Sequence, residues 1–223
     1  MKKGVIFDLD GTLIDTPAGI VEGFLYSLNC LNYFNINAID IRNTIGLPLE
    51  KAFASLLKVD TSDALISAAI KNYHKAFNEI VLPKAKQLIF SGVTKGLTDL
   101  KEQGYTLAIA TSKYLKSANN LLTAAELINY FDLIVGADLV NNPKPHPEMG
   151  FLVIEKLQLS PKNTFMIGDT THDLFMANEA GIRSIGVTYG IHDYKKLESA
   201  NPEYISDNFS NVVQYILQHN HWK

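Results

Sequence analysis

The stretch of sequence that decides the fold reads Gly4-Val5-Ile6-Phe7-Asp8-Leu9-Asp10-Gly11-Thr12-Leu13-Ile14-Asp15. Residues 5–7 have the apolar character of a buried strand, which ends on two carboxylates, Asp8 and Asp10. Residues two apart in a strand point to the same side, so these acids should repel each other. The repulsion is acceptable if a divalent cation lies between the chain and an anionic ligand, or if the acids have different functions. A solvated pair of turn aspartates is the competing interpretation.

Three further segments carry chemically active side chains. Residues 107–113, Leu-Ala-Ile-Ala-Thr-Ser-Lys, read as an apolar strand that ends on hydroxyls. Residues 142–148, Asn-Pro-Lys-Pro-His-Pro-Glu, read as a loop stiffened by prolines around Lys144. Residues 165–173, Phe-Met-Ile-Gly-Asp-Thr-Thr-His-Asp, read as another strand that ends on acids. Together they supply the parts of a phosphoryl-transfer site, which weighs against the solvated-turn interpretation.

The order of these motifs resembles that of the haloacid dehalogenase-like hydrolase superfamily over essentially the whole chain. The long insert between the first and second motifs is similar to the subgroup with a helical cap that includes phosphoglycolate phosphatases. The resemblance implies an α/β fold, with a Rossmann-like parallel sheet core and an inserted all-helical cap domain. It also implies that the first strand is central, between the Thr111 strand and the Asp169 strand, so that the site lies at a topological switch point.

The pattern from residue 16 to about residue 83 is helical. The first helix is expected to begin with Thr16 as its N-cap and Pro17 in its first turn. Three more helices follow, with starts expected at Asp40, at Pro48, and at Thr61 or Ser62. Their apolar stripes predict the core of a helix bundle. We therefore expect a helical cap domain over residues 16–83 and an α/β catalytic core over residues 1–15 and 84–223.

From residue 91 onward, short apolar strands alternate with helices, which predicts a mostly parallel sheet covered on both faces. Strands are expected over residues 105–111, 133–136, 164–168, 184–187 and, at an edge, 203–205. Helices are expected over residues 93–103, 115–125, 147–157, 173–180 and 211–218.

The composition bounds the class of protein. A chain of 223 residues, 47% of them apolar, is long enough for one sizeable domain and an inserted one. The net charge of −3 argues against nucleic acid as the main partner. No apolar run is long enough for a membrane span and no signal peptide is apparent, so a cytoplasmic location is expected. The single cysteine, Cys30, is expected to be a small core residue.

The resemblance implies a role for each acid. Asp8 would attack phosphorus and form an aspartyl-phosphate. Asp10 would protonate the leaving alkoxide and then take a proton from the hydrolytic water, a role that needs a raised pKa. Asp169 would bind Mg²⁺ directly and Asp173 would bind it directly or lie just outside, while Asp8 and the backbone carbonyl of Asp10 would complete the protein's share. An acid favoured by a helix N-terminus is the alternative interpretation of Asp173.

The remaining core candidates would bind the phosphate. The hydroxyl of Thr111 and the backbone N–H of Ser112 would anchor it, and Lys144 would neutralise the transferring group and Asp8. Thr111 could instead cap the following helix. Lys113 is expected to be solvated or at the rim of the substrate site.

The turn Gly46-Leu47-Pro48-Leu49 in the insert is similar to a turn that faces the site in the phosphoglycolate phosphatase-like group, so Gly46 is a candidate substrate contact. Arg42 and Lys51 flank this turn and would either meet a substrate carboxylate or remain solvated. His146 and His172 are expected at the rim. A helical lid would exclude water and restrict the substrate to a small phosphorylated metabolite.

These features favour a Mg²⁺-dependent phosphatase of a small phosphate monoester, with phosphoglycolate as the first guess and pyrophosphate, a sugar phosphate or a nucleotide monophosphate open. A phosphomutase of the β-phosphoglucomutase kind would share the core motifs but needs cap cations that are not evident here. A phosphonatase would use Lys51 for a Schiff base, without the rest of that pattern. Receiver-type phospho-accepting regulators combine similar groups but are roughly half as long and have no cap. The oligomeric state is left open.

Overall fold

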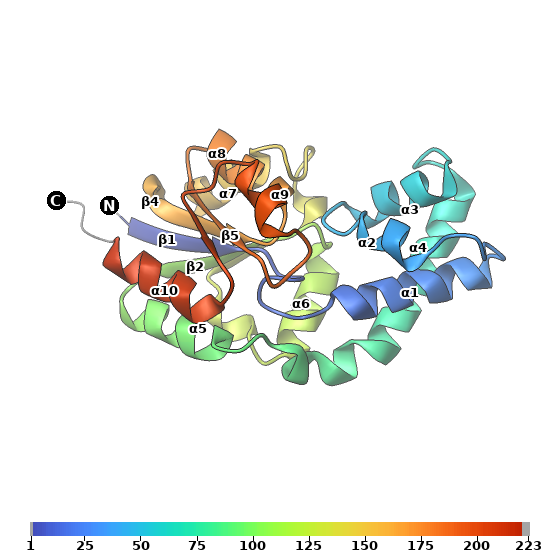
Figure 1. Ribbon diagram of the computed structural model, residues 1–223, viewed down its shortest axis with the longest axis horizontal. Helices are drawn as coiled ribbons and strands as arrows, with labels where there is room; N and C mark the ends of the chain where they lie inside the picture. Colours follow the sequence, from blue (N-terminus) through green and yellow to red (C-terminus); the bar gives the residue numbers. More distant parts are fainter. Residues whose placement is uncertain (1, 220–223) are drawn as a thin grey trace.

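The computed structural model describes residues 2–219, so the outermost residues of the predicted core, 1 and 220–223, lie outside the described part. Six parallel strands form one sheet in the order β3-β2-β1-β4-β5-β6 (Figure 1). The strands are β1 (Lys2–Phe7), β2 (Thr106–Ala110), β3 (Leu133–Val135), β4 (Leu159–Gly168), β5 (Arg183–Val187) and β6 (Tyr204–Ser206). The central position of β1, between β2 and β4, confirms the predicted fold class and strand order.

The sheet is buried on both faces, which is why its strands read as unbroken apolar runs. Successive side chains of β1 belong to different clusters: Val5 and Phe7 pack on one face, and Ile6 packs on the other. The first face is covered by α5 (Val93–Glu102), α6 (Leu115–Ala124) and α10 (Phe209–Gln218), and the second by α7 (Glu148–Leu157) and α8 (Thr171–Glu179) (Figure 1). Short helices complete this part, namely η2 (Ile128–Tyr130), η3 (Ala137–Leu139) and α9 (Tyr194–Glu198).

The insert between β1 and α5 is helical and extends beyond the carboxyl ends of the strands (Figure 1). It contains α1 (Pro17–Cys30), α2 (Ala38–Arg42), α3 (Leu49–Leu57), α4 (Ala64–Ile80) and the 3-10 helix η1 (Leu82–Leu88). The predicted apolar stripe of α4 is buried at Ile66, Tyr73 and Phe77. The ring of Phe24 lies 4.3 Å from that of Phe53 and 5.0 Å from that of Tyr73, so an aromatic cluster holds α1, α3 and α4 together.

The two chain segments that connect the insert to the sheet run side by side. Asp15 N donates to Leu88 O over 2.7 Å, and Phe90 N donates to Leu13 O over 3.1 Å. Ile14 and Ile89 form an antiparallel bridge between these bonds. The insert is thus joined to the sheet through one short, paired crossing.

Three expectations about the insert were wrong. The second helix is capped by Asn37, not begun by Asp40, and the fourth is capped by Asp63, whose side chain accepts from Leu65 N over 2.8 Å. Asn37 lies three residues before Asp40, and Asp63 directly follows Ser62, so in each case a nearby polar residue provides the cap. Cys30 is exposed rather than buried, because it ends α1 on the side that faces solvent. Among residues 2–219, no helix has both the length and the apolar character needed to cross a membrane.

Candidate active site

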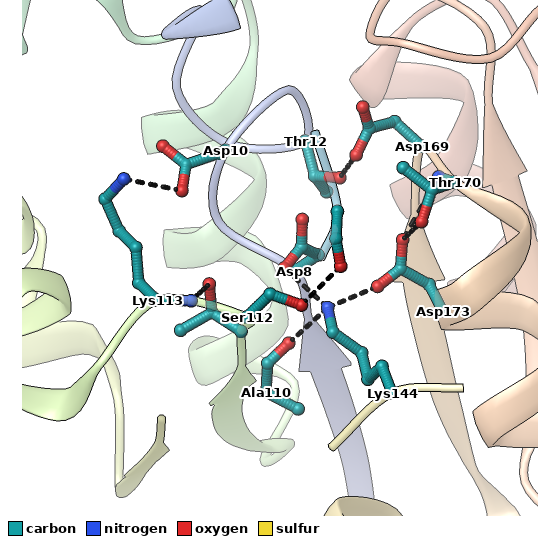
Figure 2. Close-up of polar contacts among 12 residues, drawn as sticks. Asp8, Asp10, Thr12, Ala110, Ser112, Lys113, Lys144, Asp169, Thr170 and Asp173 are labelled. Carbon is teal, nitrogen blue, oxygen red and sulfur yellow. Dashed lines mark hydrogen bonds and ion pairs between the residues drawn. The ribbon is translucent and has the colours of Figure 1, made fainter. Parts of the chain in front are cut away.

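Three neighbouring strands carry most of the predicted site. Asp8 follows β1, Thr111 follows β2 and Asp169 follows β4, so all three lie at the carboxyl edge of the sheet. Figure 2 shows Asp8 and Asp169 in this region. The two acid-bearing segments are locked in register, because Asp8 N donates to Ile167 O over 2.9 Å. Ligands of open α/β sheets bind at this edge.

Lys144 reaches into the centre of this edge from the proline-rich loop before α7. Its ammonium donates to Asp8 Oδ1 over 2.8 Å, to Asp173 Oδ1 over 2.5 Å and to Ala110 O over 3.0 Å (Figure 2). Only 4% of the residue is exposed. Burial opposes its charge, but the carboxylates of Asp173 and Asp8 outweigh burial and raise the pKa of Lys144 above its ordinary value. Lys144 therefore remains a cation that faces the two acids.

The carboxylates of Asp8, Asp169 and Asp173 are buried together, with one oxygen of each within 4.8 Å of the others. Burial, opposed by the charge of Lys144 and reinforced by that of Asp173, raises the pKa of Asp8 to about 7. Burial, and then the charges of Asp8 and Asp173, raise the pKa of Asp169 well above its usual range. With all three carboxylates ionised, one ammonium would leave two negative charges in excess, which one divalent cation would balance. Clustered carboxylate oxygens are the ligands that Mg²⁺ prefers.

Asp169 is held rigidly. Its Oδ1 accepts from the hydroxyl of Thr12 over 2.9 Å, and its Oδ2 accepts from Ile191 N over 2.8 Å. A Cβ at Gly11 or at Gly190 would come within 2.3 Å of Asp169 Oδ2, so the backbone at both positions must be glycine for the carboxylate to fit. Two loops, after β1 and after β5, therefore fix this side chain.

Asp173 has two roles at once. It is the third residue of α8, where its Oδ2 accepts from the backbone N–H and the hydroxyl of Thr170 as part of a capping box. Its Oδ1 accepts from Lys144. Asp173 therefore lies at a helix N-terminus, as the alternative interpretation expects, and also contacts the lysine of the predicted site.

Asp10 stands apart from the buried acids. Its carboxylate accepts from the hydroxyl of Thr16 over 2.5 Å and pairs with the ammonium of Lys113 over 3.0 Å (Figure 2). Thr16 is the N-cap residue of α1, as expected, but its side chain makes no cap bond because it binds Asp10 instead. The Lys113 side chain is only 10% exposed, lies 4.2 Å from the ring centroid of Phe77 and lines the cavity beside the site. Of the two positions expected for it, solvated or at the rim of the substrate site, this placement favours the second.

The hydroxyl residues after β2 occupy the opposite side of the site. Thr111 is buried and its Oγ1 accepts from Lys113 N over 3.2 Å. It does not cap the next helix, since Tyr114 is the N-cap residue of α6. The hydroxyl of Ser112 donates to Gly46 O over 2.6 Å, and Gly46 has a φ of +102°. The glycine turn of the insert is thus tied directly to the segment predicted to bind phosphate.

A cavity separates the core side of the site from the insert. The core contributes Asp8, Asp10, Thr111, Ser112, Lys113 and Thr170 to its lining, and the insert contributes mainly apolar residues around the turn at Gly46. The other rim candidates do not line it. The guanidinium of Arg42 donates to Gly190 O over 3.2 Å, while Lys51 and His146 border a separate hollow. His172 is half-buried behind Gly46, with no hydrogen-bond partner for its Nδ1.

Several residues that shape the site were not predicted. The Thr170-to-Asp173 spacing is a capping-box signature and was legible in the sequence. Thr12 stands inside the first motif, but nothing local indicates that it reaches Asp169. The contact from Thr16 to Asp10 spans six residues and the contact from Ile191 N to Asp169 spans 22, and a single sequence carries no signal for either.

Comparisons with known proteins show which family and which relatives the chain resembles in sequence and in fold. The model of the haloacid dehalogenase-like hydrolase family matches residues 5–187. The chain is 54% identical over 213 residues to "Probable phosphatase IndB" of Dickeya dadantii, covering 96% of this chain and 93% of that protein. It is 31% identical over 218 residues to "Pyrophosphatase PpaX" of Bacillus mycoides, covering 97% of each. The crystal structure of a predicted phosphatase from Clostridium acetobutylicum matches with a TM-score of 0.84 at 30% identity, covering 98% of this chain and 100% of that one.

Proposed function

The chain belongs to the haloacid dehalogenase-like hydrolase family, and from this premise we propose that it is a Mg²⁺-dependent phosphatase that hydrolyses a small phosphate monoester through an aspartyl-phosphate on Asp8. The observation that carries the proposal is the buried constellation of Asp8, Asp169 and Asp173 around the ammonium of Lys144. A structural ion pair would balance its charges, whereas this cluster has more acids than cations, and burial and mutual repulsion raise the pKa of Asp8 and of Asp169.

In the first step, a carboxylate oxygen of Asp8 forms a bond to phosphorus as the bond from phosphorus to the alcohol oxygen breaks. Asp10 gives its proton to the departing alcohol oxygen. Lys144 and the donors at Thr111 and Ser112 bind the phosphoryl oxygens, where negative charge gathers. Asp8 and Asp169, with Asp173 beside them, would hold Mg²⁺, which would supply neutralisation of the charge that develops during the transfer.

In the second step, Asp10 is a carboxylate and takes a proton from a water molecule that attacks the phosphorus of the aspartyl-phosphate. The bond between Asp8 and phosphorus breaks, which releases inorganic phosphate and restores both acids. The position of Asp10 on the cavity side, away from the buried cluster, suits a group that must face first the alcohol and then the water.

We further propose that residues 16–83 act as a cap domain on a catalytic core made of residues 1–15 and 84–223. The bond from Ser112 to Gly46, the bond from Tyr114 to Glu50 and the placement of Lys113 under Phe77 support this, because each joins the core to the insert around the cavity. Closure of this kind would exclude water from the aspartyl-phosphate until the alcohol has left.

The test is a comparison of wild-type protein with the Asp8→Asn and Asp40→Asn variants, using p-nitrophenyl phosphate with Mg²⁺. Asp40 is exposed on α2 and serves as the matched control. We expect Asp8→Asn to keep less than about one hundredth of the wild-type rate, because the attacking oxygen is lost. Chelation of Mg²⁺ should stop wild-type turnover, and added Mg²⁺ should restore it.

Acid-quenched wild-type protein should carry one phosphoryl group on Asp8 by mass spectrometry, and the label should disappear with time. A label that persists without release of phosphate would instead indicate a phospho-accepting regulator. Substantial turnover by Asp8→Asn, or full activity after exhaustive chelation, would contradict the proposal.

A further inference from the structure

The insert forms the half of the cavity that faces away from the phosphate site, and this half is apolar. Phe24, Ile20 and Ile45 are buried around it, and Leu47 and Leu49 border it. Phe24 belongs to the aromatic cluster with Phe53 and Tyr73. Because that cluster packs three helices together, these apolar side chains cannot move away and let a charged side chain take their place without disrupting the insert.

The charges around this half of the cavity are negative. Among the described residues that line the cavity, the insert contributes Glu50, Tyr73 and His74 as ionisable groups, and it contributes no lysine or arginine. Burial, and then the charge of Lys113, lower the pKa of His74, so its imidazole is uncharged at neutral pH. The two cationic side chains that flank the turn at Gly46 do not line this cavity. Arg42 binds Gly190 O, and Lys51 borders the separate hollow.

The single lysine among the described residues of the cavity lining already has partners within the protein. Lys113 pairs with Asp10 over 3.0 Å and lies against Phe77. Opposite it, Glu50 Oε1 accepts from the hydroxyl of Tyr114 over 2.5 Å, which fixes this carboxylate at the cavity. A second anionic group on the substrate would therefore enter an apolar space between Asp10 and Glu50, with no uncommitted cation in the lining.

We infer that the substrate is a phosphate monoester whose alcohol portion is uncharged and largely apolar, and that Glu50 and the apolar wall at Leu49 select against a second anionic group. The inference rests on the proposed function and narrows it. It disfavours phosphoglycolate, which carries a carboxylate, and pyrophosphate, in which the leaving group is itself a phosphate. Like charges brought together in a desolvated site cost several kcal/mol, whereas an apolar alcohol gains from burial against Phe24 and Leu49.

The experiment compares kcat/KM for four compounds with the wild-type protein and Mg²⁺: propyl phosphate, 2-hydroxyethyl phosphate, phosphoglycolate and pyrophosphate. Hydroxyethyl phosphate replaces the carboxylate of phosphoglycolate with a hydroxymethyl group and keeps nearly the same size. We expect both uncharged esters to exceed phosphoglycolate and pyrophosphate by at least about tenfold. p-Nitrophenyl phosphate serves as the reference for phosphoryl transfer itself.

Two variants assign the selection to the insert. Glu50→Gln should raise kcat/KM for phosphoglycolate relative to hydroxyethyl phosphate, and Leu49→Lys should raise that ratio further, since it places a cation at the cavity. Lys51→Gln is the matched control, because Lys51 lies outside the cavity lining, and it should leave the ratio unchanged.

The inference is overturned if wild-type protein hydrolyses phosphoglycolate or pyrophosphate as well as the uncharged esters, or if Lys51→Gln selectively impairs phosphoglycolate. In both cases p-nitrophenyl phosphate would still be hydrolysed, so the proposed function would stand. Failure to hydrolyse any of the compounds, p-nitrophenyl phosphate included, would overturn the proposed function and this inference with it.

Discussion

Two aspartates only two residues apart acquire different properties from their partners. Asp8 is buried against Lys144, and burial dominates a pKa raised to about 7. Asp10 lies at the cavity and is held by the hydroxyl of Thr16 and the ammonium of Lys113. β1 ends at Phe7, so both acids lie in the segment that leaves the sheet, where Asp8 joins the buried cluster and Asp10 pairs with Lys113 at the cavity.

Asp10→Asn separates the two chemical steps. The amide keeps an oxygen that can accept from Thr16, so the local geometry should persist, but it can no longer donate or take the catalytic proton. We expect each step to slow by about 10²–10⁴-fold with unactivated esters. With p-nitrophenyl phosphate the first step should be partly rescued, because nitrophenolate needs little protonation as it leaves.

Rapid quench should then show a burst of p-nitrophenol, followed by a slow steady rate and accumulation of phosphorylated Asp8. Equal slowing of activated and unactivated esters without a trapped intermediate would assign Asp10 a positioning role instead.

At this scale, the sequence located the charged groups of the site because they end apolar strands, and parallel strands bring their ends to one edge. It could not predict how the groups bind one another. The pair formed by Lys113 and Asp10 and the bond from Thr12 to Asp169 depend on rotamers and on loops 103 and 157 residues away in the chain. For that reason the sequence left open whether Lys113 is solvated or lies at the rim of the substrate site.

At the scale of elements, the turn at Gly46 should be intolerant of a side chain. A Cβ there would lie 3.1 Å from His172 Nδ1, on a backbone with φ of +102°. Gly104 also has a positive φ, of +75°, but has nothing within 4 Å of such a Cβ, and it serves as the control. Alanine at either position should cost about 1 kcal/mol of stability.

Only Gly46→Ala should also reduce kcat/KM, because the displaced turn borders Thr170 and Ser112 at the cavity. Urea unfolding and steady-state kinetics on both variants measure the two effects. Equal kinetics for Gly46→Ala and Gly104→Ala would show that the turn does not shape the site.

The hydrogen bond between the loop after β5 and the first turn of α8 depends on a neutral histidine. His192 Nδ1 accepts from Thr171 N over 3.0 Å, and burial, then the charge of Lys196, lower the pKa of His192 to about 4. The unfolded chain, with an ordinary histidine pKa of about 6.5, binds a proton first as the pH falls. The stabilisation is therefore complete above pH ~6.5 and is lost progressively toward pH ~4.

His192→Asn provides an oxygen that accepts from Thr171 N and does not titrate. Between about pH 7.5 and pH 5, the wild type should lose about 1 kcal/mol more stability than this variant, a figure reduced for partial solvent access. Chemical denaturation at both pH values measures the difference. A parallel loss in the two proteins would exclude His192 as the source.

Element boundaries show where local signals compete. Asn37 and Asp63 cap α2 and α4, although Asp40, Thr61 and Ser62 are equally good capping types within a turn of them. Which one caps is decided by the position of the whole helix in the bundle. α9 and η1 were not anticipated, since five- and seven-residue segments contain too little periodicity to be recognised.

At the scale of the whole molecule, the unbalanced acids should make stability depend on Mg²⁺. An ion that binds only the folded state at about 100 times its Kd adds ~2.7 kcal/mol. For a chain of this length that corresponds to a rise in Tm of about 5–10 °C. Asp169→Asn should abolish most of the rise, because it removes a ligand and one of the excess charges.

Thermal unfolding with MgCl₂, against NaCl of equal ionic strength, measures this rise independently of activity. An equal rise in the Asp169→Asn variant would place the ion elsewhere.

The overall architecture was the most predictable property of the chain. The apolar runs and the alternation of strands and helices predicted a parallel sheet and a helical insert, because these features are repeated along the sequence and support one another. The central position of β1 was implied by the family resemblance that the four motifs carry. The exposure of Cys30 was not predictable in this way. It depends on which side of the last turn of α1 faces its neighbours, and a single residue carries little of that information.

The paired crossing at Leu13–Asp15 and Leu88–Phe90 has an evolutionary consequence. Everything between these two segments is a side branch of the sheet, and the chain enters and leaves it at one paired crossing. A gene for this chain can therefore acquire a different insert by recombination at two nearby places in the fold, without rethreading a strand. Catalytic chemistry and substrate choice can then be inherited from different ancestors, and each can be exchanged while the other is kept.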